Sequence, residues 1–177
     1  DFTMIEGYGA YLNYKDNMKL LREMLQTIIM NLFGTLNITI EGREVDLSGE
    51  WGSVSFRDLI LKYADIDINI ANTKEKLLDA INDKNIVIES EVALEDLGFG
   101  NLVDQLYKKV ARPHLVNPVF LVEHPTDLSP LARANDDNPN IVDRFQLVIN
   151  GAEIINAYSE LVDPQEQEKR LLEQAKL

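Results

Sequence analysis

Apolar residues recur three or four positions apart near the start of the chain, which is the spacing of one face of a helix. The repeating positions are Met18, Leu21, Leu25, Ile28, Ile29 and Leu32. Gly34 follows them, and glycine often ends a helix because it adopts the left-handed conformation without strain. The pattern predicts one amphipathic helix from about Asp16 to Phe33.

Polar and apolar residues then alternate, as they do along half-buried strands. The alternation covers residues 37–41 and 44–47, and Gly42 lies between the two runs. A glycine in that place suits the tight turn of a hairpin. We therefore predict a β-hairpin that turns at Gly42.

The pattern becomes helical and acidic from about residue 55 to residue 112. Ser55 is a candidate N-cap for a first helix, and Asn72 with Glu75 is a candidate capping box for a second. The third helix carries apolar residues at helical spacing and stops before a proline: Leu102, Val103, Leu106, Tyr107, Val110 and Pro113. We interpret residues 57–112 as a helical insertion that hangs off a sheet.

The last third of the chain returns to strands. Residues 117–123 are an apolar run, residues 134–139 are a polar loop, and two strands flank residues 150–151. Asp163 before Pro164 is a good start for a final helix, because aspartate caps helices and proline fits the first helical position. Segregated helices and antiparallel strands indicate the α+β fold class.

Two carboxylates and an amide gather in this region, namely Glu153, Asn156 and Glu160. Successive side chains of a strand point to opposite faces, so Glu153 and Asn156, three positions apart, share a face only if the strand bulges. Residues 154–155 are the expected place of the bulge. Because carboxylates close together repel each other, this face needs a cationic or metal-bound ligand, and we expect the chemistry there.

Composition is typical of one soluble globular domain: 177 residues, of which 45% are hydrophobic. The absence of cysteine excludes disulfides and thiolate metal sites and suits a reducing compartment, so we expect the cytoplasm. No apolar run approaches the roughly 20 residues that cross a bilayer, so we expect no membrane partner. The net charge of −13 would repel a polyanion, so this piece alone should bind RNA poorly.

Residues 153–164 read E-I-I-N-A-Y-S-E-L-V-D-P, residues 1–11 read D-F-T-M-I-E-G-Y-G-A-Y, and residues 124–133 read H-P-T-D-L-S-P-L-A-R. These three separated stretches resemble segments of one family, the class II lysyl-tRNA synthetases: in that order, its segment E-I-x-N-A/G-F/Y-S/T-E-L-x-D-P, the second strand of its motif 2, and its H-P-x-x-x-S-P-L-A segment. The matches occur in the family's order, and residues 57–112 lie outside them. The resemblance implies that residues 1–177 are part of the antiparallel-sheet catalytic domain of a class II aminoacyl-tRNA synthetase, with the helical insertion.

The resemblance implies an activity as well. The family activates lysine with ATP to lysyl-adenylate and transfers the lysyl group to tRNA(Lys) in protein synthesis, as a cytoplasmic homodimer. Magnesium is its cofactor and neutralises phosphate charge during adenylate formation. No side chain is expected to act as a general base, because the attacking lysine carboxylate is already ionised; His124 and His114 are therefore given no catalytic role.

The resemblance carries over to individual residues. Glu160 and Tyr8 match the family residues that hold the lysine ε-ammonium, and Glu6 matches the residue that holds the α-amino group. Asn156 matches the residue at the carboxylate end of the lysine. Phe2 matches the residue that stacks on adenine, and Glu153 matches a magnesium ligand. Glu6 and Tyr8 are two positions apart in a strand pattern and hence on one face.

Gln146 departs from the family pattern, which has a second metal-binding glutamate at this position. A neutral amide oxygen can coordinate magnesium but supplies no charge, so metal affinity or number should be reduced. Ala152 also replaces a residue that is often basic in the family. These two departures bear on full activity.

The elements that the family places before and after this stretch are not seen: the anticodon-binding domain, motif 1, the arginine-containing start of motif 2, and motif 3. We therefore expect an excised piece of a catalytic domain that is inactive alone. Two alternatives stay open. One is a paralogous ligase that attaches a lysine-like amino acid to a protein side chain; the other is a non-catalytic binding module, motivated by Gln146.

Overall fold

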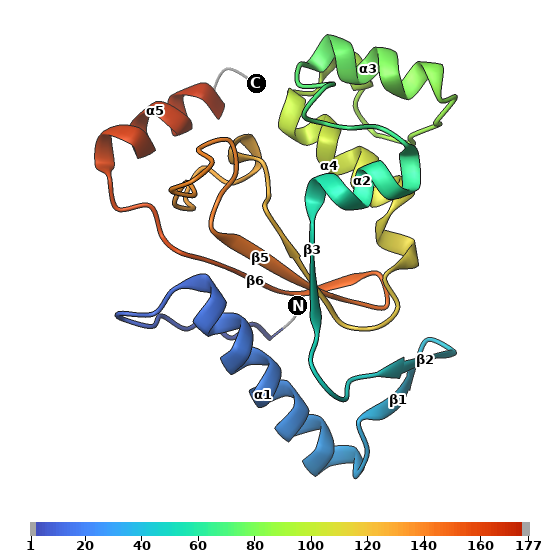
Figure 1. Cartoon of the computed structure of the whole chain (residues 1–177), viewed down its shortest axis with the longest axis vertical. Helices are drawn as coiled ribbons and strands as arrows, with labels where there is room; N and C mark the ends of the chain where they lie inside the picture. The colour runs from blue at the N-terminus through green and yellow to red at the C-terminus, as the bar shows by residue number, and fades with distance from the viewer. Residues whose placement is uncertain (1–2, 175–177) are drawn as a thin grey trace.

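The computed structural model describes residues 3–174, and Figure 1 shows the arrangement of the elements. The helices in this range are α1 (Tyr14–Phe33), α2 (Phe56–Ala64), α3 (Lys74–Asp83), α4 (Phe99–Val110) and α5 (Pro164–Gln174), with short 3-10 helices η1 (Leu94–Asp96), η2 (Arg112–His114) and η3 (Thr126–Leu128). The strands are β1 (Asn37–Ile40), β2 (Arg43–Asp46), β3 (Gly52–Ser55), β4 (Val119–Val122), β5 (Arg144–Ile149) and β6 (Ala152–Tyr158).

Strands β3 to β6 form one sheet in the order β3-β4-β5-β6. The pairs β4–β5 and β5–β6 are antiparallel, as expected, whereas β3 and β4 run parallel. A parallel pair needs a long crossover connection, and the helical segment between β3 and β4 supplies it. Strands β1 and β2 form the predicted hairpin, in which Glu41 and Gly42 both have positive φ.

Helix α1 covers one face of the sheet, as Figure 1 shows. It begins at Tyr14 because Asn13 and Asp16 form a capping box, and it ends at Phe33, where the C-cap Gly34 follows with a φ of 71°. The side chains that pack on the sheet are Tyr14, Met18, Leu21, Leu25 and Ile29. Ile28 and Leu32, which the periodicity placed on the same apolar face, are 44% and 71% exposed.

Helices α2 and α4 belong to the larger core, which reaches the other side of the sheet through Leu121 and Val148. The segment therefore packs onto the sheet, where the sequence had suggested an insertion hanging off it. Ser55 caps α2 as predicted, but Thr73 caps α3 in place of Asn72. The Asn72 side chain instead accepts a hydrogen bond from Lys76 Nζ.

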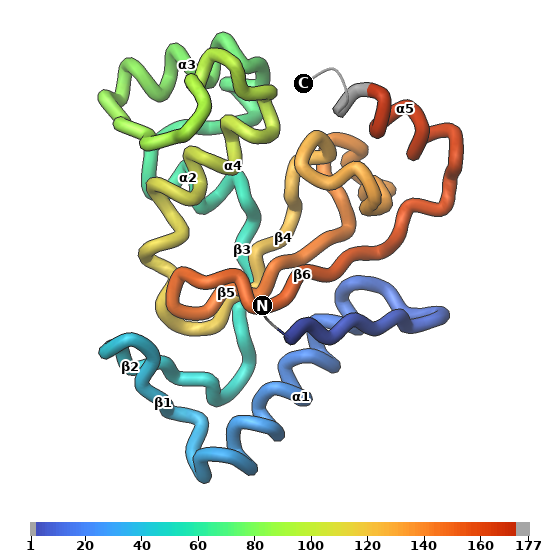
Figure 2. The backbone as a smooth tube through the Cα atoms, turned by 180° about the vertical axis from the view of Figure 1, so that it is seen from behind, coloured from blue at the N-terminus to red at the C-terminus, as the bar shows by residue number. Residues whose placement is uncertain are grey.

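A bulge in β6 sets which side chains share the polar face of the sheet. Leu147 pairs with Ile155 and Val148 with Glu153, so Ile154 is the extra residue, in the place predicted for the bulge. Figure 2 shows the β5–β6 hairpin from behind. The bulge allows Glu153 and Asn156 to lie on one face.

Residues 3–13 differ from the expectation of a motif 2 strand. They form no strand, because no other described segment pairs with them through a ladder of backbone hydrogen bonds. Their end is held by the Tyr14 backbone N–H, which donates to Ser159 Oγ at 3.2 Å. Within the described part of the chain, no helix combines the length and apolar character needed to span a bilayer.

Candidate functional site

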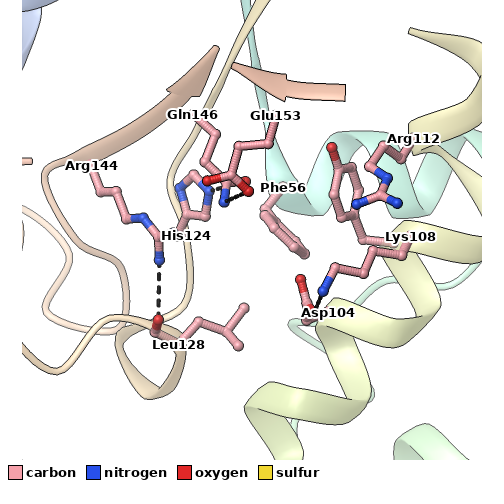
Figure 3. A pocket seen from close by; sticks show the side chains of 10 residues that line it. Phe56, Asp104, Lys108, Arg112, His124, Leu128, Arg144, Gln146 and Glu153 are labelled. Carbon is pink, nitrogen blue, oxygen red and sulfur yellow. Dashed lines mark hydrogen bonds and ion pairs between the residues drawn. The ribbon is translucent and has the colours of Figure 1, made fainter. Parts of the chain in front are cut away.

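A pocket of about 240 Å³ opens between the polar face of the sheet and helix α4. We call it the central pocket, and Figure 3 shows its side chains. Its lining residues are Phe56, Asp104, Tyr107, Lys108, Arg112, His124, Leu128, Arg144, Gln146 and Glu153. Strands β5 and β6 therefore bring two residues predicted from sequence, Gln146 and Glu153, to one wall.

Arg144 organises the sheet side of the central pocket. Its Nε donates to Asn156 Oδ1 at 2.8 Å, and its Nη1 donates to Ser129 Oγ at 2.7 Å and to the Leu128 carbonyl at 3.1 Å. Burial lowers the pKa of this guanidinium from its ordinary value, but an arginine remains charged. Arg144 thus fixes the orientation of the Asn156 amide and presents a positive charge at the pocket wall.

The Gln146 amide lies between His124 and Glu153, as Figure 3 shows. Gln146 Nε2 donates to Glu153 Oε2 at 2.8 Å, and Gln146 Oε1 lies 3.2 Å from His124 Nε2. An ionised carboxylate can only accept hydrogen bonds, so the amide nitrogen must face Glu153. The amide oxygen then needs a donor, so His124 carries its proton on Nε2.

His124 is 1% exposed. Burial, together with the charge of Arg144, lowers the pKa of its imidazole to about 3, so the ring is neutral near pH 7. Its Nδ1 has no hydrogen-bond partner among the described residues. The sequence assigned His124 no role, and its only signal was its place in the H-P-x-x-x-S-P-L-A segment.

The donor set suits a magnesium ion only in part. Over residues 3–174, no group of three or more His, Cys, Asp and Glu side chains could hold a metal. Glu153 offers a hard carboxylate oxygen, but the Gln146 oxygen points toward His124. Magnesium is commonly held by one or two carboxylates plus substrate phosphates. The described residues therefore fit a magnesium ion that would be bound jointly by Glu153 and the phosphate groups of a bound compound.

A second group of predicted residues lies outside the central pocket. Tyr8 Oη donates to Glu6 Oε1 at 2.6 Å, which confirms that these two side chains point the same way although they lie in no strand. This hydrogen bond and the Glu6 charge raise the pKa of Tyr8, and the negative charge of Glu160 adds to the effect. We call Glu6, Tyr8 and Glu160 the outer cluster.

Glu160 is held in place by backbone pairing. It forms an isolated bridge with Ala132, and the neighbouring Ser159 carbonyl accepts from the Arg133 N–H at 2.8 Å. The segment of residues 124–133, which resembles a family motif, thus supports one of the predicted acids by backbone pairing. All three side chains of the outer cluster are exposed. Phe2, predicted to stack on adenine, lies outside the described residues.

The structure adds pocket residues that the sequence analysis did not select. Lys108 pairs with Asp104 at 2.6 Å, and Arg112 makes no ion pair within the described range. The hydroxyl of Tyr107 is buried there without a partner in the described part of the chain. These residues belong to α4 and η2, in the segment that no family motif covered, so no sequence signal singled them out.

Comparisons with known proteins show the family of the chain. The family model described as tRNA synthetases class II (D, K and N) matches residues 1–177. Proteins named lysine–tRNA ligase are 40% identical in Thermosipho africanus and 38% identical in Thermotoga maritima over the whole chain, and 34% identical in Prochlorococcus marinus over 97% of it. The matches cover 34%, 34% and 33% of these relatives, so the chain spans about a third of their length.

Proposed function

Because the chain belongs to the class II tRNA synthetases (D, K and N), we propose that it is part of the catalytic domain of a lysine–tRNA ligase. In this proposal residues 57–112 are the domain's helical insertion. The full-length enzyme activates lysine with ATP to lysyl-adenylate and transfers the lysyl group to tRNA(Lys). The support is the family membership, the names of the relatives, and the outer cluster.

The outer cluster is the observation that carries lysine as the substrate. Glu6 and Tyr8 lie more than 150 positions before Glu160 in the sequence, yet the negative charge of Glu160 reaches the Tyr8 hydroxyl. Two carboxylates and a phenol oxygen suit an ammonium group, which offers only donors. We assign the ε-ammonium to Glu160 and Tyr8, and the α-amino group to Glu6.

Asn156 holds the carboxylate end of the lysine in this proposal. Its Oδ1 is occupied by Arg144 Nε, so its amide N–H groups are the ones that remain for an incoming carboxylate oxygen. The Arg144 charge lies directly behind this amide. Together they orient the carboxylate that attacks the ATP α-phosphate, and orientation of the reactants is a large part of such catalysis. Phe2 is proposed to stack on the adenine.

Glu153 is the proposed protein ligand of magnesium, whereas the oxygen of Gln146, the second candidate from the sequence, faces His124. When bound, magnesium neutralises phosphate charge as the α-phosphate is attacked. Glu153 holds its carboxylate at the edge of the central pocket, and Gln146 restrains it by a hydrogen bond. The chain itself therefore positions one anionic oxygen for the metal.

The remaining partners are proposed from the family alone. The full-length enzyme is a cytoplasmic homodimer that binds lysine, ATP and tRNA(Lys). The net charge of −13 on this chain disfavours contact with RNA, so tRNA binding would depend on other parts of the protein.

Two alternative functions stay open. One is a ligase that modifies a protein side chain, and the other is a non-catalytic module, which the turned amide of Gln146 would suit.

Exchange of label between pyrophosphate and ATP tests the activation step. The full-length protein is incubated with each of the twenty amino acids in turn, with ATP and magnesium. The proposal expects exchange with lysine, and exchange with aspartate or asparagine at background level. No exchange with any amino acid would favour the non-catalytic module and refute the proposed ligase.

A further inference from the structure

His124 is buried beside the proposed metal ligand, and the proposed reaction gives it no task. The imidazole is 1% exposed, its ring packs 5.2 Å from the Phe56 ring, and its Nε2 faces Gln146. A buried polar side chain is costly unless its groups are paired. Only one nitrogen of His124, Nε2, has a hydrogen-bond partner, because Nδ1 is unpartnered among the described residues.

The hydrogen-bond directions around Gln146 are fixed by chemistry. Glu153 can only accept, so it receives the Gln146 amide N–H at 2.8 Å. The amide oxygen must then accept from His124 Nε2, 3.2 Å away. Rotating the amide by half a turn would place its oxygen against the Glu153 carboxylate, and this contact would be repulsive. The amide N–H groups would then face His124 Nε2, which could accept them only if the imidazole proton moved to Nδ1.

We infer that His124 is a positioning residue, which locks the Gln146 amide so that Gln146 restrains Glu153 by donating to it and is not itself a metal ligand. The inference rests on the proposed role of Glu153. A residue behind a metal ligand orients it, and losing such a partner typically weakens metal binding about 10–100-fold. In this chain His124, which follows β4, contacts Gln146 of β5, and Gln146 in turn contacts Glu153 of β6.

Manganese binding tests this role without an activity assay. The full-length protein is titrated with Mn²⁺ in the presence of a non-hydrolysable ATP analogue, and free Mn²⁺ is measured by electron paramagnetic resonance. His124→Leu should weaken Mn²⁺ binding about 10-fold, because the freed amide no longer holds Glu153. His114→Leu is the matched control, since His114 stacks on Tyr63 at 4.5 Å outside the pocket, and it should leave binding within about twofold.

A double-mutant cycle separates positioning from general damage. In a Gln146→Met background, His124→Leu should change Mn²⁺ binding less than about twofold, because His124 acts only through the amide. His124→Gln, which places a donor at similar reach, should restore binding within about threefold of the parent. A loss that persists in the Gln146→Met background, or a His124→Gln variant as weak as His124→Leu, would overturn the inference.

Histidine labelled with ¹⁵N gives a test that needs no folded variant at position 124. The His124 signal of the full-length protein should be that of a neutral ring protonated on Nε2, and Gln146→Met should shift it. A ring protonated on Nδ1 would overturn the inference. Glu153→Gln tests the proposed function separately: unchanged Mn²⁺ binding there would remove Glu153 from the metal site, whereas the ¹⁵N signal would still report on the pair His124 and Gln146.

Discussion

Glu153 and Asn156 lie on the same face of the sheet although they are three positions apart in one strand. The cause is the bulge at Ile154, which absorbs one residue between the pairs Leu147–Ile155 and Val148–Glu153. Each of the two side chains then meets a different residue of β5: Glu153 accepts from Gln146, and Asn156 accepts from Arg144. The proposed metal end and carboxylate end of the site are therefore set by one backbone irregularity.

The Glu160 carboxylate is predicted to select lysine in the full-length enzyme. Glu160→Gln nearly keeps the shape of the side chain but removes its charge, and hydrogen bonds to a charged group are about twice as strong as neutral ones. We expect kcat/KM for lysine in pyrophosphate exchange to fall at least about tenfold. Glu168→Gln, on an exposed residue of α5, is the matched control and should change little. An unchanged kcat/KM in Glu160→Gln would remove this residue from the site.

Gln146→Glu is predicted to lower the magnesium concentration that the full-length enzyme requires. The substitution keeps the side-chain length and adds an anionic oxygen beside Glu153, and magnesium prefers such oxygens. His124 Nε2–H can donate to the new carboxylate as it does to the amide. The measurement is a magnesium titration of lysine-dependent exchange, with Gln165→Glu at the start of α5 as control. Indistinguishable curves for the parent and Gln146→Glu would mean that position 146 does not reach the metal.

The Asp67 carboxylate is predicted to stabilise the folded chain near neutral pH and to lose that effect in acid. Hydrogen bonds from Arg57, at 2.7 and 2.5 Å, and from the Asn69 backbone lower the pKa of Asp67 to about 2 from its ordinary value of 3.8. A lowered pKa in the folded state adds stability above about pH 4, and that stability is lost as the pH falls from 4 to 2. Thermal unfolding of the 177-residue chain should therefore show Asp67→Asn destabilised at pH 6 and equal to the parent near pH 2.

Asp79→Asn is the control for that series. Asp79 is exposed on α3 and makes no ion pair within the described range, so its substitution should leave the melting temperature nearly unchanged at pH 6. An Asp67→Asn variant with the parent's melting temperature at both pH values would show that the pair with Arg57 contributes nothing to stability.

Gly100 is predicted to be required for the close approach of α4 to η3. A Cβ atom at this position would lie 3.0 Å from Asp127 Cβ and 3.2 Å from its carbonyl carbon. Overpacking of this kind costs about 1–3 kcal/mol, so Gly100→Ala should lower the urea midpoint of unfolding. At Gly52 an added Cβ meets nothing within 4 Å, and Gly52→Ala should cost less. Equal midpoints for both variants would contradict the contact.

The sequence predicted local elements well where a local signal determines them. The turn at Gly42, the cap of α2 at Ser55 and the cap at Asp163 depend on residues close in the chain. The parallel pairing of β3 with β4 could not be predicted in this way, because it depends on how about sixty intervening residues fold. The cap of α3 is Thr73 and not Asn72. The sequence could not decide between them, because both side chains offer an oxygen that can accept from the first turn of the helix.

The candidate site likewise contains residues that the sequence selected and residues that it could not select. The outer cluster and Glu153 were selected by matched motifs, and the structure brings Tyr8 onto Glu6 by a hydrogen bond of 2.6 Å. Lys108 and Arg112 were not selected, because their approach to the central pocket arises from the packing of α4 and η2 near the sheet. Arg144 of β5 was not selected because its contacts with Asn156 and Ser129 depend on strand pairing and loop placement. The direction of the Gln146 amide was equally beyond reach, since it depends on His124, twenty-two positions away.

Transfer of lysine to tRNA is the measurement that tests the central claim most directly. The full-length protein is incubated with ATP, magnesium, tRNA(Lys) and radiolabelled lysine, and label is followed in the tRNA and in protein fractions. The account predicts acid-precipitable label on tRNA(Lys) that is released by mild alkali, as expected for an ester, and that falls at least about tenfold in Glu160→Gln. Label on a protein in place of tRNA, or activation of another amino acid in preference to lysine, would contradict it.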